Sequence, residues 1–408
     1  MAQIGKIYLG GREGKNNSKE IFYSGIAFQL NLDSQIDILY SFDNGNLEVE
    51  MRKGQNSIVA RCKQVLSDEE ILKNGFEYCQ KSLDILSLQN HIHMHTLQPV
   101  DEHTLVINYN GQYSLRRVGI LEFCPQIGVN IIQKDKDGNV IPLQKQPQLS
   151  WEPAFRFYRL SQMSSDLYEA YRNLFLAFES TLNQICPKNN DESETKWFKR
   201  ALNFISIKID LLTIVPFGTK DPVAFLVGTQ YENVRCSLFH SKNKIMLPHE
   251  NLNPKVISEA YTILLRLWRE INGVYFDISN SGSVMTYTGF KLIMDGLFKE
   301  SFKLQFTDDI TPPNSNDTLV SPKNHPLFSL SNLSYDNNSK PDKIILKGEI
   351  TLEKLSKRML IHRIAILTKN TLFSIDYIKD SLSTEGIDVF ETCQSVHLIN
   401  KKTPITMF

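Results

Sequence analysis

The hydrophobic pattern of this chain changes its period along the sequence. Between Ser164 and about Asn272, apolar residues recur at the 3.6-residue spacing of amphipathic helices, and strand-like alternation nearly vanishes. The segments before and after carry short alternating or aromatic-rich runs that are typical of strands. We therefore expect an α+β multidomain fold, in which a central four-helix bundle is flanked by β-rich amino- and carboxyl-terminal domains.

Chain length supports this division. The sequence has 408 residues, and a prior of roughly 150 residues per domain gives two or three domains. We place a β-rich domain with one helix at 1–150, the helical bundle at 151–278 and a second β-rich domain at 279–408. Hydrophobic residues make up 41% of the chain, which is enough apolar surface to fold most of this length.

Two local signals fix elements in the amino-terminal domain. Asn44-Gly45 lies between two β-type runs, so residues 36–53 are predicted to form a hairpin. Ser67 begins a Ser-Asp-Glu-Glu capping box, and helical spacing follows to about residue 88. Strand-like runs return at 103–143.

The central region carries start and stop signals for four helices. The first begins after Ser164-Ser165-Asp166 and ends at Cys186-Pro187, and the second covers 197–212. The third begins after Asp221-Pro222 and continues to about residue 241, and the fourth opens near Asn253-Pro254. Helices of this length with short connections predict an up-and-down bundle.

The carboxyl-terminal region is more mixed. The run TGFKLIMDGLF is compatible with a short helix or a strand, and FKLQFTD is predicted to be a strand. A loop rich in Pro, Asn and Ser occupies 311–340, and further β-type runs follow.

Charge and composition limit the possible functions. Lys+Arg and Asp+Glu are equal at 45 each, so any contact with nucleic acid has to be local rather than driven by net charge. The beginning of the sequence lacks the apolar run of a signal peptide, and no apolar stretch approaches the 18 or more residues of a membrane span. We expect a cytoplasmic protein with no membrane partner. The 6 cysteines are scattered without zinc or redox spacing.

The most informative motif is Tyr-Glu-Asn-Val-Arg-Cys-Ser-Leu-Phe-His at 231–240, near the end of the third predicted helix. Arg235 and His240 are five positions apart, which on an ideal helix separates them by about 140° around the axis and about 7.5 Å along it. They reach a common group only if the helix ends or deforms near His240, or if two copies each offer their pair to a shared cleft.

In this motif and its setting, the region 160–275 resembles the HEPN superfamily, whose signature is an Arg, four to six residues and a His at the end of the third helix of a four-helix bundle. The YEAYRNLFLAFES helix is similar to the opening helix of HEPN domains in bacterial abortive-infection and methylamine-utilisation-type proteins. The resemblance covers about a quarter of the chain and neither flank.

The resemblance implies a metal-independent endoribonuclease with no cofactor, active as a homodimer through the bundle, in bacterial defence or toxin-like growth arrest. Arg235 would hold the RNA phosphate and His240 would move protons or orient the 2′-hydroxyl. These residue types suit that chemistry, because imidazole titrates near neutrality and a guanidinium binds phosphate through several donors. The flanking domains would sense a phage trigger or bind a regulatory protein.

One position departs from the family pattern. Active members usually carry Asn, Asp or His directly after the Arg, whereas this chain has Cys236. This favours a second hypothesis, a non-catalytic scaffold that dimerises through the bundle and binds a protein partner through its β-rich domains. Arg235 would then pair with Glu179 or Glu232, and His240 would cap the helix.

Other candidate sites are weaker. The imidazoles of His91, His93 and His95 could hold a metal ion if the segment were a strand, but a polar connector after a helix is the simpler interpretation. Residues 10–14, Gly-Gly-Arg-Glu-Gly, lack the following Gly-Lys-Ser/Thr of a phosphate loop. The basic residues of the second helix indicate a solvated face, and the aromatic cluster at 151–158 is expected to pack a domain junction.

Overall fold

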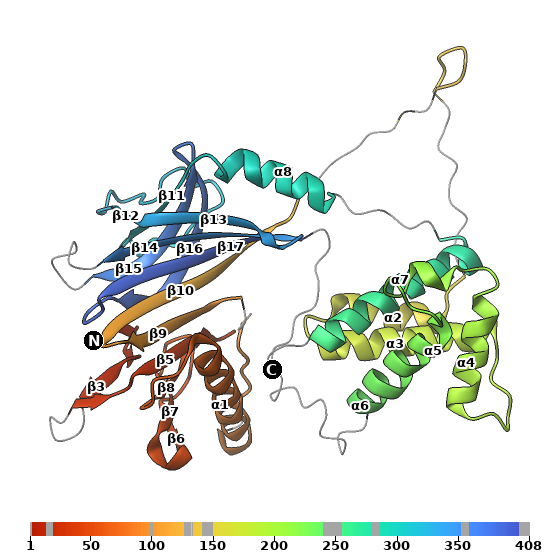
Figure 1. Ribbon diagram of the computed structural model, residues 1–408, viewed down its shortest axis with the longest axis horizontal. Coiled ribbons are helices and arrows are strands. Elements are labelled where there is room, and N and C mark those ends of the chain that lie inside the picture. The colour runs from red at the N-terminus through yellow and green to blue at the C-terminus, as the bar shows by residue number, and fades with distance from the viewer. Residues whose placement is uncertain are drawn as a thin grey trace. The chain divides into compact units, whose positions relative to one another are not determined.

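The structure is a computed structural model that describes residues 2–13, 19–90, 92–97, 101–125, 132, 134–140, 150–239, 255–278, 285–351 and 359–399. It divides the chain into a β-rich unit, built mainly from Met1–Pro125 and Met285–Lys401, and a helical unit, built mainly from Gln126–Val284 (Figure 1). The expected α+β organisation, with a helical region between β-rich flanks, is confirmed.

A nine-stranded sheet joins the two ends of the chain in the β-rich unit. Its order is β13 (Ser331–Lys340), β14 (Lys343–Thr351), β17 (Val389–Leu398), β10 (Gln112–Phe123), β9 (His103–Tyr109), β5 (Ser24–Gln29), β8 (Ser57–Cys62), β7 (Leu47–Met51) and β6 (Ile38–Phe42). The central pair, β10 and β17, is parallel and runs from Ser114 opposite Val389 to Phe123 opposite Leu398. We expected separate amino- and carboxyl-terminal domains, and this pairing makes them one unit instead.

A six-stranded sheet packs against the inner face of the larger one. Its order is β12 (Phe328–Ser329), β11 (Phe302–Thr307), β15 (Leu360–Thr368), β16 (Thr371–Ser383), β1 (Gln3–Ile4) and β2 (Ile7–Tyr8). Leu115 and Val396 of the larger sheet share an apolar core with Ile364 of the smaller one. The buried guanidinium of Arg117 also reaches across to Asp376 of β16 with two hydrogen bonds of 2.9 Å. A short pair, β3 (Gly11–Glu13) with β4 (Lys19–Ile21), stands apart from both sheets.

Helix α1 (Asp68–Asn90) covers part of the outer face of the nine-stranded sheet, beside β5 and β8 (Figure 1). The predicted capping box is confirmed, because the Ser67 amide lies 2.9 Å from a Glu70 carboxylate oxygen and the Glu70 amide lies 3.3 Å from the Ser67 hydroxyl. The predicted hairpin is also confirmed as β6 and β7, with left-handed φ values at Asn44 and Gly45.

The predicted loop at 311–340 is partly wrong, since its last ten residues form the edge strand β13. This strand is mostly exposed and has no buried apolar face, so it lacks the period-2 signal of a half-buried strand. Its polar side chains reach α8 (Tyr287–Phe298) instead, where Tyr335 and Asn337 both donate to Asp295 at 2.6 and 2.7 Å. The runs GVNIIQKD and VIPL, predicted as strands, lie largely outside the described residues.

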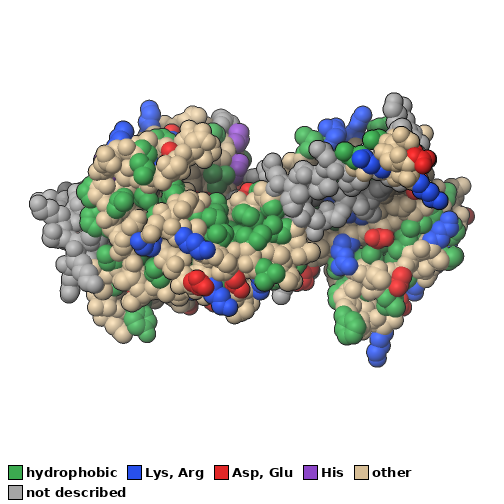
Figure 2. Space-filling model, turned by 90° about the horizontal axis from the view of Figure 1, so that it is seen from above, with side chains coloured by type: hydrophobic (Ala, Val, Ile, Leu, Met, Phe, Trp, Pro, Cys, Tyr) green, Lys and Arg blue, Asp and Glu red, His purple; other side chains and the backbone are tan. Residues whose placement is uncertain are grey.

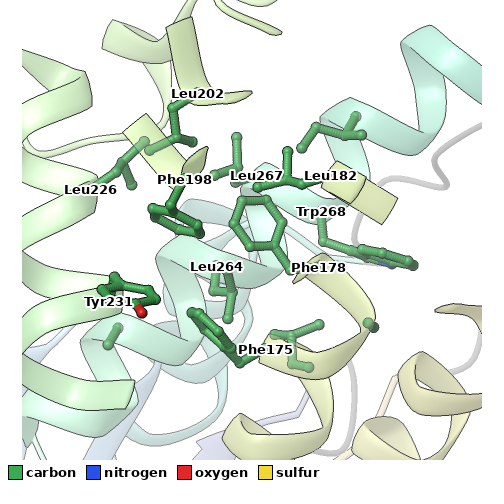
Figure 3. Packing of buried hydrophobic residues seen from close by; sticks show 14 of the residues in the cluster. Phe175, Phe178, Leu182, Phe198, Leu202, Leu226, Tyr231, Leu264, Leu267 and Trp268 are labelled. Carbon is green, nitrogen blue, oxygen red and sulfur yellow. The ribbon is translucent and has the colours of Figure 1, made fainter. Parts of the chain in front are cut away.

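The helical unit contains α2 (Pro153–Met163), α3 (Leu167–Ile185), α4 (Glu194–Ile205), the 3-10 turn η2 (Leu211–Thr213), a third long helix and α7 (Lys255–Phe276). What we call the third long helix corresponds to the third predicted helix. It consists of α5 (Pro222–Leu226), a π-helical segment η3 (Val227–Arg235) and α6 (Cys236–Phe239). The core of the helical unit is strongly aromatic, with Phe175, Phe178, Phe198 and Tyr231 packed together (Figure 3).

The aromatic cluster at 151–158, which we expected to pack a domain junction, makes contacts inside the helical unit. Tyr158 stacks on Trp268 of α7 at 5.5 Å, and Phe155 meets Phe276 at 5.8 Å. Phe155 and Tyr158 belong to α2, a helix that we did not predict. The second helix, predicted at 197–212, is shorter than expected: Ser193 caps its start, it ends at Ile205, and residue 212 lies in the separate η2 turn.

Among the described residues, no helix is both long enough and apolar enough to cross a membrane.

Candidate functional site

The third long helix has unusual internal geometry where it carries the candidate motif. It begins regularly, with Pro222 at its first turn and the Asp221 carboxylate accepting from the Ala224 amide at 2.9 Å. The nine residues Val227–Arg235 are then π-helical, and Cys236–Phe239 return to α-helical geometry. Stretches of π-helix are rare and are often found at functional sites. Here the π-helical segment includes the first half of the motif at 231–240.

A buried glutamine fastens the π-helical segment to its neighbours. The Tyr171 hydroxyl of α3 lies 3.0 Å from the main-chain oxygen of Gln230 and 2.9 Å from its Oε1. The Gln230 amide group in turn donates to the main-chain oxygen of Ala260 in α7 at 3.2 Å. Because the side chains are buried and hydrogen-bonded, they fix the segment against both helices.

Arg235 lies at the end of the π-helical segment and is half-buried. Its Cζ atom lies over the ring of Tyr231 at 5.1 Å and over the ring of Phe239 at 5.2 Å, one helical turn away on either side. Cation–π attraction holds the guanidinium in place without using its N–H donors. Its buried Nε has no hydrogen-bond acceptor within the described part of the chain. Within the described residues, Arg235 is therefore a positioned cation whose Nε still has a hydrogen bond to donate.

Two carboxylates had been considered as partners of Arg235. Within the described ranges, no ion pair joins Arg235 to Glu179 or Glu232, and Glu232 is exposed. Glu179 of α3 does interact electrostatically with Arg235. Burial raises the pKa of Glu179, and the attraction of Arg235 opposes this by lowering it. Arg235 is thus influenced by a nearby acid but not neutralised by direct contact with it.

The second residue of the predicted pair, His240, lies outside the described residues, and the described helix ends at Phe239. The structure therefore gives the surroundings of Arg235 and not its distance to His240. Cys236, the residue that departs from the HEPN pattern, is half-buried next to Arg235.

One cation near this site had not been singled out from the sequence. The guanidinium of Arg172, on α3, lies over the ring of Phe239 at 5.3 Å. Its Nη1 atom is 2.8 Å from a carboxylate oxygen of Glu169, three residues earlier on the same helix. Arg172 sits in the run YEAYRNLF, but only the packing of α3 against α6 brings it beside the motif.

The weaker candidates, the histidines at 91–95 and the glycine-rich residues 10–14, do not form ligand sites within the described residues. His93 lies 2.7 Å from the Ser87 hydroxyl, and the main chain of His95 pairs with Asn31, while His91 lies outside the described residues. The described chain contains no group of three or more His, Cys, Asp or Glu side chains that could hold a metal ion. Residues 11–13 form strand β3 rather than a phosphate-binding turn.

The expected basic face of α4 is partly neutralised, since Arg200 pairs with Glu192 at 2.8 Å. On the face of the molecule seen in Figure 2, Lys and Arg side chains are scattered among Asp and Glu side chains. Any attraction for an anion therefore depends on a local arrangement such as the one around Arg235.

The chain is thus an α+β protein whose helical unit carries Arg235 near the end of the third long helix, with its guanidinium between two aromatic rings. Comparison with protein-family models, with curated proteins and with solved structures finds no match to this chain.

Proposed function

We propose that this chain is a metal-independent endoribonuclease in which Arg235 binds the scissile phosphate. The observation that carries the proposal is the state of the Arg235 guanidinium, which two rings hold in place while its Nε lacks an acceptor among the described residues. A buried donor without a partner costs free energy, so a ligand that supplies an acceptor is favoured there. A phosphate oxygen meets this need and pairs with the positive charge.

The chemistry requires little more than this cation and one group that transfers protons. RNA supplies its own nucleophile, because its 2′-hydroxyl can attack the neighbouring phosphorus and expel the 5′-oxygen. An arginine stabilises the charge that grows on the phosphate oxygens. His240, which follows Phe239 in the sequence, is our candidate for the acid or base, because imidazole changes its charge near neutral pH.

We further propose that two copies of the chain act together through the helical unit. The helix is α-helical from Cys236 to Phe239, so each step after Arg235 turns by about 100°. Regular continuation would direct Arg235 and His240 to different sides. A second copy that supplies its own pair resolves this, as does a change of direction at His240. A role in bacterial defence or growth arrest rests on the HEPN resemblance.

The proposal is tested with RNA in the presence of a chelator of divalent metals. The unaltered chain is expected to cleave RNA, whereas Arg235→Ala and His240→Ala are each expected to lose about a hundredfold or more in rate. Arg156→Ala is the matched control, since its guanidinium also lies over a ring, that of Trp151 at 5.5 Å, in the same unit. Equal cleavage by all four proteins would rule out a role for Arg235 and His240.

A second candidate is the non-catalytic scaffold, which is favoured by apolar side chains exposed at the end of α4 and in the segment that connects it to α5. These are Phe204, Ile207, Leu212 and Phe217. The Phe217 ring is fully exposed, which is more typical of a contact surface than of a free loop. A scaffold would leave RNA intact under every condition and would lose self-association in Phe217→Ser. Cleavage that depends on Arg235 would exclude this candidate.

A further inference from the structure

The ring of Phe239 connects two arginines from different helices. Its centroid is 5.2 Å from Cζ of Arg235 and 5.3 Å from Cζ of Arg172, and 6.3 Å from the ring of Phe175. The two Cζ atoms are therefore no further apart than the sum of the first two distances. Within this distance one anionic strand can contact both guanidiniums, and its negative charge favours both contacts.

The second arginine is available to a ligand. The Arg172 side chain is 43% exposed, and its only ion pair in the described chain is with Glu169, which is 55% exposed. An exposed ion pair on a helix surface contributes little to stability, because water and salt screen it. Exchanging Glu169 for a phosphate oxygen therefore costs little. Arg235, by contrast, is half-buried and fixed by its two rings.

We infer that Arg172 is a second phosphate-binding residue of this site, which contacts the RNA backbone beside the phosphate held by Arg235. The inference rests on the proposed function and extends it, since it assigns two backbone contacts to one protomer and sets the strand across the Phe239 ring. Neither contact reads a base, so binding at this point is predicted to be independent of sequence.

The test separates binding from cleavage. A single-stranded oligonucleotide whose 2′-hydroxyls are all methylated cannot be cut through that group, so its affinity can be measured at equilibrium over a range of salt concentrations. Each phosphate contact to a single strand contributes about 0.7 to the slope of log affinity against log salt. Arg172→Gln is expected to reduce the slope by about 0.7 and the affinity at low salt by roughly tenfold.

Two further variants make the result specific. Arg156→Gln removes another ring-bound arginine of the helical unit and is expected to leave the slope unchanged. Glu169→Gln frees Arg172 from its carboxylate and is expected to tighten binding by about two- to threefold. A structural role for Arg172 would give neither the change of slope nor the opposite effects of Arg172→Gln and Glu169→Gln.

The outcomes distinguish this inference from the function on which it rests. If the unaltered chain binds the oligonucleotide and Arg172→Gln keeps the same slope, Arg172 is not a phosphate contact, while the proposed ribonuclease stands. If the unaltered chain cleaves no RNA and does not bind the oligonucleotide, both proposals fail.

Discussion

Glu179 lies in the electrostatic field of Arg235, and its protonation affects stability in a predictable direction. Burial raises its pKa in the folded protein above the ordinary value of 4.5. The native state therefore holds the Glu179 proton more strongly than the unfolded chain does. The contribution of Glu179 to the free energy of unfolding falls as pH rises from the pKa of the unfolded chain through that of the folded protein. At neutral pH the ionised carboxylate destabilises the helical unit.

We expect Glu179→Gln to raise the melting temperature at pH 7 by about 1–2 °C, because the amide carries no charge to desolvate. The gain should vanish near pH 4, where Glu179 is already protonated in the native state. Thermal unfolding followed by circular dichroism measures this, with the exposed Glu232→Gln as control. A loss of stability in Glu179→Gln at pH 7 would mean that attraction to Arg235 outweighs burial.

At the residue scale, the sequence predicts one arginine and not the other. Arg235 is found because its spacing to His240 is itself a motif. The role of Arg172 depends on α3 packing against α6, so that a residue 67 positions away from Phe239 contacts the same ring. The spacing of residues within a helix predicts contacts along that helix and not contacts with another helix.

At the element scale, two helical glycines in the β-rich unit have opposite surroundings. A Cβ atom at Gly296, on α8, would meet nothing within 4 Å. At Gly75, on α1, it would collide with Cγ2 of Ile26 in β5. Gly75 is thus required for close packing of α1 on the sheet. Gly296 has no such role, and it destabilises the fold because glycine increases the conformational entropy of the unfolded chain.

We expect Gly296→Ala to raise the free energy of unfolding by about 0.5–1 kcal/mol. Gly75→Ala should lower it by about 1–3 kcal/mol, because α1 has to shift or Ile26 has to leave its rotamer. Chemical denaturation of the full chain, monitored by near-ultraviolet circular dichroism, gives both values. Similar changes in the two variants would contradict the packing of α1 described above.

The elements that the sequence predicts correctly are those with local signals. The hairpin at Asn44-Gly45 and the helix after Ser67 depend on turn and cap residues that act over a few positions. The edge strand β13 and the π-helical segment carry no such signal. The first is held by its pairing with β14, and the second by the buried contacts of Gln230.

At the scale of the whole molecule, the β-rich unit depends on both ends of the chain. The parallel pair β10–β17 and the Arg117–Asp376 contact join residues before 125 to residues after 285. Val59, Val106 and Leu115 of the first part are buried in a core that includes Ile364 and Phe390 of the second. Neither part alone covers this core.

We therefore expect fragments 1–125 and 285–408 to be insoluble or unfolded when each is produced alone. Produced together, they should associate and show a cooperative unfolding transition, because each supplies the other with a sheet neighbour and a covering layer. Co-purification through a tag on one fragment measures this. A soluble, cooperatively folded 1–125 fragment would support the separate domains that the sequence suggested.

The central claim is that RNA is cut through its own 2′-hydroxyl at the Arg235 site. The most direct measurement compares an RNA oligonucleotide with its fully 2′-O-methylated counterpart, both incubated with the chain and a metal chelator. We predict cleavage of the first, with a 2′,3′-cyclic phosphate at the new end, and no cleavage of the second. Equal cleavage of both, or products that end in a 3′-hydroxyl and a 5′-phosphate, would contradict it.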